Sequence, residues 1–188
     1  WLEFEIDTKR ELLYTKLDNK KKILATMFLR ALGFGQREEL ISMFYKTKEV
    51  RVLPEREEQE KLLNMVVAKN VFVKTEDGSE KKLFQAGQKL LAHNVSDIVS
   101  AGITSITVID FEAEGSLNSQ LILNCFQREE DKFTPDPIEN DEPTREEAIT
   151  EVYSILRPGE PISYESACED LHTMFFTARR YDIGRVGR

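Results

Sequence analysis

Two predicted turns in the sequence contain basic side chains that have no obvious structural role there. Asp18-Asn19-Lys20-Lys21-Lys22 places three lysines at the end of a predicted hairpin, and Arg157-Pro158-Gly159-Glu160-Pro161 fixes an arginine at a rigid bend. Lysine and arginine are the side chains that most often contact phosphate oxygens. Each turn therefore fits either a phosphate-contacting site or an ordinary solvated surface, and the pattern alone leaves both readings open.

The residue types that usually perform catalysis or bind metals lack partners at useful spacing. His93 and His172 have no second ligand or nucleophile near them, and Cys125 and Cys168 are too far apart for a zinc motif. A Pro-rich loop contains carboxylates without the ordered spacing of a calcium loop, at Asp136, Asp141 and Glu142. We therefore predict no catalytic residue, no metal ligand and no cofactor in this chain.

The charge of the chain argues against a free-standing nucleic-acid binder. Its 188 residues include 26 Lys and Arg and 34 Asp and Glu, for a formal net charge of -8. The charges are segregated, however, because residues 8–30 and 177–188 are basic and residues 128–151 contain ten acids and three bases. We expect the two basic segments to share a face and the acidic segment to point away.

The sequence shows neither a transmembrane segment nor a signal peptide. No apolar run approaches the roughly 18 residues that cross a bilayer, and the first residues do not resemble a signal peptide. Two cysteines are too few for a disulfide framework in a chain of this length, which favours the cytoplasm. The chain starts at Trp1 without an initiator Met, which favours a segment of a longer protein.

Hydrophobic periodicity predicts the elements that position the two basic turns. Residues 2–6 alternate with period two and pair with residues 11–17 in a hairpin. Residues 24–32 change to helical spacing and stop at Gly33, and a second helix covers residues 37–45. The lysine turn should therefore directly follow the hairpin.

The middle and the end of the chain differ in their predicted secondary structure. Residues 48–112 contain a β-branched run, a helix predicted to begin after an Asn94 cap, and a clear strand over residues 103–111, which together indicate a small α+β unit. Thr144 and Glu147 form a capping box for a helix ending near Leu156, so the bend at Arg157 closes that helix. The fold class predicted is α+β.

Several motifs, in order, closely resemble the β subunit of bacterial DNA-directed RNA polymerase. The arginine bend and the closing Arg-Tyr-Asp block are the most specific of them. The matching residues are Trp1-Leu2-Glu3-Phe4-Glu5, Leu17-Asp18, Ala25-Thr26, Leu29-Arg30-Ala31-Leu32-Gly33, Arg157-Pro158-Gly159-Glu160-Pro161, Phe175-Phe176, Arg180-Tyr181-Asp182 and Val186-Gly187-Arg188.

The resemblance implies a domain organisation. Residues 1–47 and 113–188 look like the discontinuous β2 or lobe domain, a helical domain with a short β-hairpin. Residues 48–112 look like the lineage-specific α+β subdomain that many bacterial β subunits carry inserted in the lobe.

The resemblance also implies a function. The lobe is a mobile wall of the cleft that holds downstream duplex DNA and the non-template strand during transcription. In the family, the tryptophan matching Trp1 stacks on a non-template base, which offers a π-face that an indole can cover. The other implied DNA-binding residues are Asp18, Lys20, Lys21, Lys22 and Arg157.

Partners follow from the same resemblance. They are DNA, the α, β′ and ω subunits and a sigma factor, with transcription regulators binding through the insertion. Magnesium belongs to the β′ subunit, so the segment should be inactive by itself although the whole complex is a nucleotidyltransferase. The alternative hypothesis is a protein-docking module whose inserted unit recruits regulators and for which DNA contact is secondary.

Overall fold

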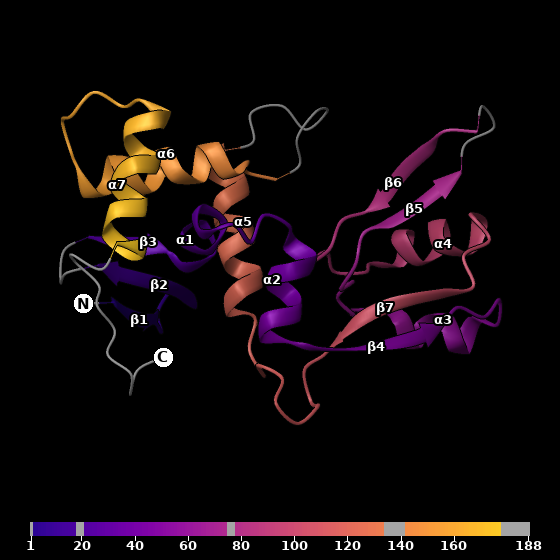
Figure 1. Ribbon diagram of the computed structural model, residues 1–188. Helices are drawn as coiled ribbons and strands as arrows, with labels where there is room; N and C mark the ends of the chain where they lie inside the picture. Colours follow the sequence, from indigo (N-terminus) through magenta and orange to yellow (C-terminus); the bar gives the residue numbers. More distant parts are fainter. Residues whose placement is uncertain (1, 18–20, 75–77, 134–141, 178–188) are drawn as a thin grey trace. The chain divides into compact units, whose positions relative to one another are not determined.

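A computed structural model of the chain is shown in Figure 1, and it describes all residues except 1, 18–20, 75–77, 134–141 and 178–188. Contacts within the chain define two compact units. Unit 1 consists of Trp1–Gly35 and Asn124–Arg188, and unit 2 consists of Gln36–Leu123. Both unit boundaries lie outside the predicted insertion of residues 48–112, so that narrower boundary stays a prediction.

Unit 1 begins with a three-stranded antiparallel sheet in the order β1-β2-β3, and helices from both ends of the chain complete it. The register pairs Phe4 of β1 with Thr15 of β2, and Thr15 with Ile23 of β3, which confirms the predicted hairpin. The elements are β1 (Leu2–Asp7), β2 (Leu12–Leu17), β3 (Lys22–Leu24), α1 (Ala25–Leu32), most of α5 (Leu121–Phe133), α6 (Arg145–Leu156) and α7 (Tyr164–Phe176).

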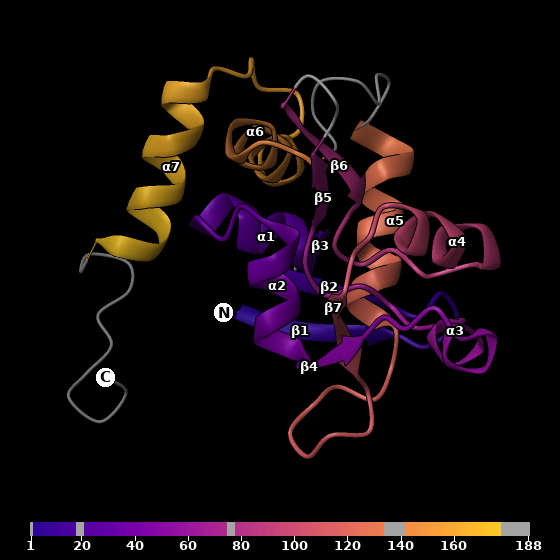
Figure 2. The same ribbon diagram turned by 90° about the vertical axis from the view of Figure 1, so that its right-hand side faces the viewer.

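The core of unit 1 joins segments that are far apart in the sequence. Helix α6 packs against both α1 and α7 (Figures 1 and 2). Ile23 and Phe28 are buried with Val152 and Leu171, and the rings of Phe28 and Phe175 meet edge to face with centroids 5.5 Å apart. The fold of unit 1 therefore depends on long-range packing between the two ends of the chain.

Local signals set the ends of these helices as predicted. Gly33 adopts a left-handed conformation (φ 117°), and its N–H bonds to the Arg30 carbonyl at the end of α1. At the start of α6 the Thr144 hydroxyl accepts from the Glu147 N–H (3.2 Å), and the Glu147 carboxylate accepts from the Thr144 N–H (2.8 Å). At the start of α7 the Ser163 hydroxyl accepts from the Ser166 N–H at 3.2 Å.

Unit 2 is continuous in sequence and has its own apolar core. Strand β4 pairs antiparallel with β7, and β5 pairs antiparallel with β6. The core includes Val67, Phe84, Ile98 and Val108. Its elements are α2 (Arg37–Phe44), β4 (Lys46–Arg51), α3 (Arg56–Leu62), β5 (Val71–Lys74), β6 (Glu80–Phe84), α4 (Ala92–Ser100) and β7 (Ser105–Asp110), followed by the first turn of α5.

The structure corrects the predicted start of α4. This helix begins at Ala92, not after an Asn94 cap, and Leu91 is its N-cap residue. Asn94 lies in the first turn, where its Oδ1 accepts from the Leu91 N–H at 2.9 Å. The amide still satisfies one backbone donor at the helix start, but from inside the helix. Both the mixed α+β class and the strand near residues 103–111 are confirmed.

Candidate nucleic-acid interface

The basic turn follows β2 and enters β3, on unit 1. Asp18 and Lys20 lie outside the described residues, as does Trp1. Lys21 and Lys22 are exposed, and 43% of the Lys22 side chain is accessible. This part of the chain thus presents two described lysines to solvent at a sheet edge.

Lys22 also has partners on its own sheet. Its Nζ forms an ion pair with Glu5 of β1 and lies 5.8 Å from the centroid of the Tyr14 ring. Lys16 of β2 pairs with the same carboxylate, and hydrogen bonds from Lys16 and then Lys22 hold the pKa of Glu5 below its usual value. Glu3 of β1 also lies opposite Lys16, so two carboxylates face these two ammonium groups, and the exposed Lys21 follows next to them.

Arg157 occupies the C-cap of α6 and turns toward α7. Its Nη2 and Nε donate to the two carboxylate oxygens of Asp170 at 3.1 and 3.4 Å, and these bonds raise the pKa of the guanidinium. The side chain remains 40% exposed. Arg157 therefore holds the Pro158–Gly159 bend against α7 while its side chain stays partly accessible.

The surroundings of Arg157 are acidic. A cavity of about 360 Å³ lies beside it, and the Tyr153 hydroxyl donates to Glu160 at 3.0 Å at its edge. That hydrogen bond raises the pKa of Tyr153. The lining residues are Tyr153, Arg157, Glu160, Ser166, Glu169, Asp170 and Thr173. Three carboxylates against one guanidinium disfavour a phosphate here, so a contact from Arg157 to DNA is better suited to a base than to the backbone.

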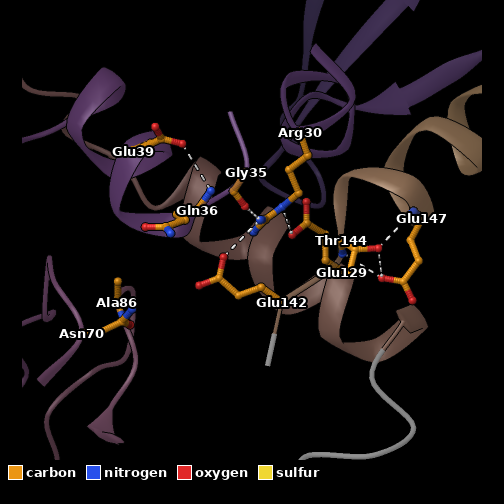
Figure 3. A network of polar contacts seen from close by, with 10 residues as sticks. All are labelled: Arg30, Gly35, Gln36, Glu39, Asn70, Ala86, Glu129, Glu142, Thr144 and Glu147. Atoms are coloured by element: carbon orange, nitrogen blue, oxygen red, sulfur yellow. Dashed lines mark hydrogen bonds and ion pairs between the residues drawn. The ribbon is translucent and has the colours of Figure 1, made fainter. Parts of the chain in front are cut away.

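Sequence reasoning missed the buried polar network around Arg30. The Arg30 side chain of α1 is fully buried, and Figure 3 shows its guanidinium aimed at Glu129, Glu142 and the Gly35 carbonyl. Its Nε donates to Glu129 Oε2 at 3.2 Å and its Nη1 to Glu142 Oε2 at 3.1 Å, while Nη1 also donates to Gly35 O. The ring of Phe126 covers the guanidinium, with its centroid 5.9 Å from Cζ.

This network corrects one expectation about charge. The acidic segment 128–151 was expected to point away from the basic segment 8–30, but Glu129 and Glu142 of the former bind Arg30 of the latter. Lys132 and Glu151 pair within the acidic segment itself. Part of the acidic segment therefore neutralises charge inside unit 1.

No group of three or more side chains that could hold a metal ion occurs among the described residues. Of the predicted carboxylate loop, Asp136 and Asp141 lie outside those residues, and Glu142 belongs to the Arg30 network. Cys125 is buried, and desolvation raises the pKa of its thiol to about 11, which disfavours the nucleophilic thiolate. No helix in the described parts of the chain is long and apolar enough to span a membrane.

Comparison with known proteins matches every residue of the chain. It is 59% identical over 188 residues to DNA-directed RNA polymerase subunit beta of Treponema denticola and 47% identical to that of Treponema pallidum. It is 41% identical, over 195 aligned positions, to the subunit of Borrelia turicatae. Each alignment spans 100% of this chain and 16% of the relative's length. No family model matches the sequence.

The chain is thus similar, along its whole length, to one part of a large nucleic-acid polymerase subunit. That subunit is the β subunit of DNA-directed RNA polymerase, which confirms the resemblance inferred from the motifs.

Proposed function

We propose that this segment is the lobe of the β subunit, a mobile wall of the downstream DNA cleft that contacts non-template strand DNA during transcription. The observation that carries the proposal is the exposure of Lys21 and Lys22 beside β3, on the unit whose motifs resemble the lobe. Lysines at such a turn gain affinity by releasing counterions from phosphates, without reading sequence.

The remaining site residues have distinct roles in this proposal. Trp1 stacks on one unpaired non-template base, while Lys20 and Asp18 contact DNA together with Lys21 and Lys22. Arg157 approaches the same strand with the accessible part of its side chain, since Asp170 binds its guanidinium. The whole polymerase is a nucleotidyltransferase located in the cytoplasm with the nucleoid. Its α, β′, ω and sigma partners and the magnesium of β′ lie outside this segment, which has no cofactor and is inactive alone.

The second candidate function is protein docking through unit 2, including the proposed insertion 48–112. Its contact surface would include large apolar side chains exposed on that unit, such as Phe72 at 51% and Leu91 at 50% exposure. A regulator that binds unit 2 without affecting DNA retention would support this candidate in place of the first.

Photocrosslinking in the assembled polymerase tests the DNA contact. We expect a benzoylphenylalanine introduced at Lys21 to crosslink to DNA at the downstream edge of the bubble. The matched control is the same group at Glu57, an exposed position on α3 of unit 2. Crosslinks from Lys21 only to protein, or equal DNA crosslinks from both positions, would contradict the proposed contact.

A further inference from the structure

The core side of the β1-β2-β3 sheet is covered unevenly. Directly paired residues of antiparallel strands lie on the same face, so Phe4 of β1, Thr15 of β2 and Ile23 of β3 share one face. Thr15 and Ile23 are buried, and Ile23 belongs to the core of unit 1, but Phe4 is 48% exposed. The core face of the sheet therefore continues onto β1, where the described residues leave about half of the Phe4 side chain uncovered.

The whole apolar side of β1 is open in the same way. Leu2 is 42% exposed although it lies opposite Leu17, which is buried, and Ile6 is 52% exposed. Residues two apart point to the same side of a strand, so Leu2, Phe4 and Ile6 form one apolar strip about 13 Å long, called the β1 strip below. Three core-side positions in succession are thus accessible.

β1 is also an edge strand, because among the described strands it pairs only with β2 (Figure 1). Proteins commonly protect an edge strand with charged side chains, which prevent it from pairing with other chains. Strand β4 of unit 2 pairs only with β7 among the described strands and has this protection. Its exposed side chains are those of Lys46, Thr47, Lys48, Glu49 and Arg51. The β1 strip, by contrast, consists of three large apolar side chains and is unprotected.

Two occupants fit the β1 strip poorly. A DNA backbone gains little from it, because phosphate contacts need cations and the strip has none. A second copy of this chain meets a different obstacle. Any antiparallel register that joins the strips of two copies also places acidic residues of β1 opposite one another, such as Glu3 opposite Glu5, and like charges in opposite positions are destabilising. An apolar surface of different sequence avoids both problems.

We propose that the β1 strip is covered by an apolar surface of the same β subunit, formed by residues outside these 188. Each alignment spans only 16% of the relative's length, so most of such a subunit lies outside this segment. A surface on the same polypeptide meets the strip at a high effective concentration, and permanent contacts are the most apolar ones. The inference rests on the proposal that this chain is a segment of a β subunit, and not on its proposed contact with DNA.

Photocrosslinking from the strip in the assembled polymerase identifies the occupant. Benzoylphenylalanine replaces Phe4, which keeps an aromatic ring at that position, and mass spectrometry locates the crosslinked residues. We expect crosslinks to the β subunit at residues outside this segment. The matched control is the same group at Glu3, an exposed residue on the other side of β1, which should lose most of these crosslinks. DNA crosslinks from Lys21, measured in parallel, distinguish a failure of this inference from a failure of the proposed function.

Alkylation of single cysteines keeps the test decisive if the larger side chain disturbs the strand. In the assembled polymerase, Ile6→Cys should react with a maleimide at least roughly tenfold more slowly than Glu3→Cys, because a covered thiol is unreactive. Each rate is divided by the rate of the same variant in urea, which removes differences in intrinsic reactivity between the two positions.

Crosslinks from Phe4 to another subunit, to DNA or to residues 1–188 would overturn the proposal, because each would assign the strip to a different occupant. An absence of crosslinks to protein would overturn it as well. Equal crosslinking from Phe4 and Glu3, or equal normalised alkylation of Ile6→Cys and Glu3→Cys, would show that the strip is no more covered than the other side of β1.

Discussion

The two units of this chain are stabilised in different ways. Unit 1 is assembled from two separated stretches of sequence, and the Arg30 network joins α1 to α5 and to the residues before α6. Unit 2 is a continuous stretch whose core cluster is formed by side chains such as Val67, Ile98 and Val108. Unit 1 also contains every residue that we propose for DNA contact. Both units bury an apolar core, and unit 1 adds to it a long-range buried polar network that joins its two separated stretches.

The largest expected effect is the loss of stability of unit 1, relative to unit 2, when the buried Arg30 is replaced. Arg30→Met takes the positive charge from Glu129 and Glu142, and breaking a buried ion pair from one side costs about 3–5 kcal/mol. We expect urea unfolding followed by NMR to show Ile149 of unit 1 losing its native signal at lower denaturant, with Val108 of unit 2 unchanged.

The exposed lysine in Lys9→Met serves as the control and should change the free energy of unfolding by less than about 0.5 kcal/mol. Equal destabilisation of both units in Arg30→Met would show that they unfold as one. A cost below about 1 kcal/mol, the value typical of an exposed pair, would show that the network contributes little.

Replacing Trp1 tests whether unit 1, and not unit 2, contacts the non-template strand. In the complete polymerase, Trp1→Ala should preserve nucleotide addition but reduce the preference for particular non-template bases, because stacking on one base is worth about 1–3 kcal/mol. Initiation and pausing on templates varied at the downstream edge of the bubble measure this. Phe72→Ala, in unit 2, is the matched removal of an exposed aromatic ring and should leave the preference intact. Identical base preferences in Trp1→Ala and the parent would rule out stacking.

Replacing unit 2 should have the smallest effect on unit 1. If the cores are separable, a short Gly/Ser linker in place of residues 36–123 should leave a folded remainder with native-like signals from Phe28 and Val152. A parallel replacement of residues 48–112 compares the predicted insertion with the contact-defined unit. A molten product from both replacements would mean that unit 1 needs unit 2 to fold.

Local features were predictable from the sequence, and long-range pairs were not. Alternation in residues 2–6 and the Thr144/Glu147 capping box identified the hairpin and α6, because each signal lies within a few residues. Helix α3 was missed because its highly charged sequence has no clear apolar stripe. The Arg30 network joins residues 99 and 112 positions apart, so no local pattern reveals it.

The candidate site also combines local features that could be predicted with a long-range pair that could not. The basic turn and the arginine bend were visible as motifs, and the structure describes Lys21, Lys22 and Arg157 at those turns. The pairing of Arg157 with Asp170 was not foreseen, because Asp170 comes from the next helix and nothing in the bend specifies its partner. Fixing such a pair requires the packing of α6 against α7.

The most direct test of the DNA-facing role of unit 1 is the salt dependence of downstream DNA retention by the assembled polymerase. The lysine turn is changed by replacing Lys20, Lys21 and Lys22 with Ala, and the control replaces three exposed lysines of unit 2, Lys46, Lys69 and Lys81. We predict weaker retention on all sequences and a log-log slope that is shallower by up to about 0.9 for each duplex phosphate that the turn no longer neutralises. An unchanged slope for the turn, or an equal change in the control, would contradict the account.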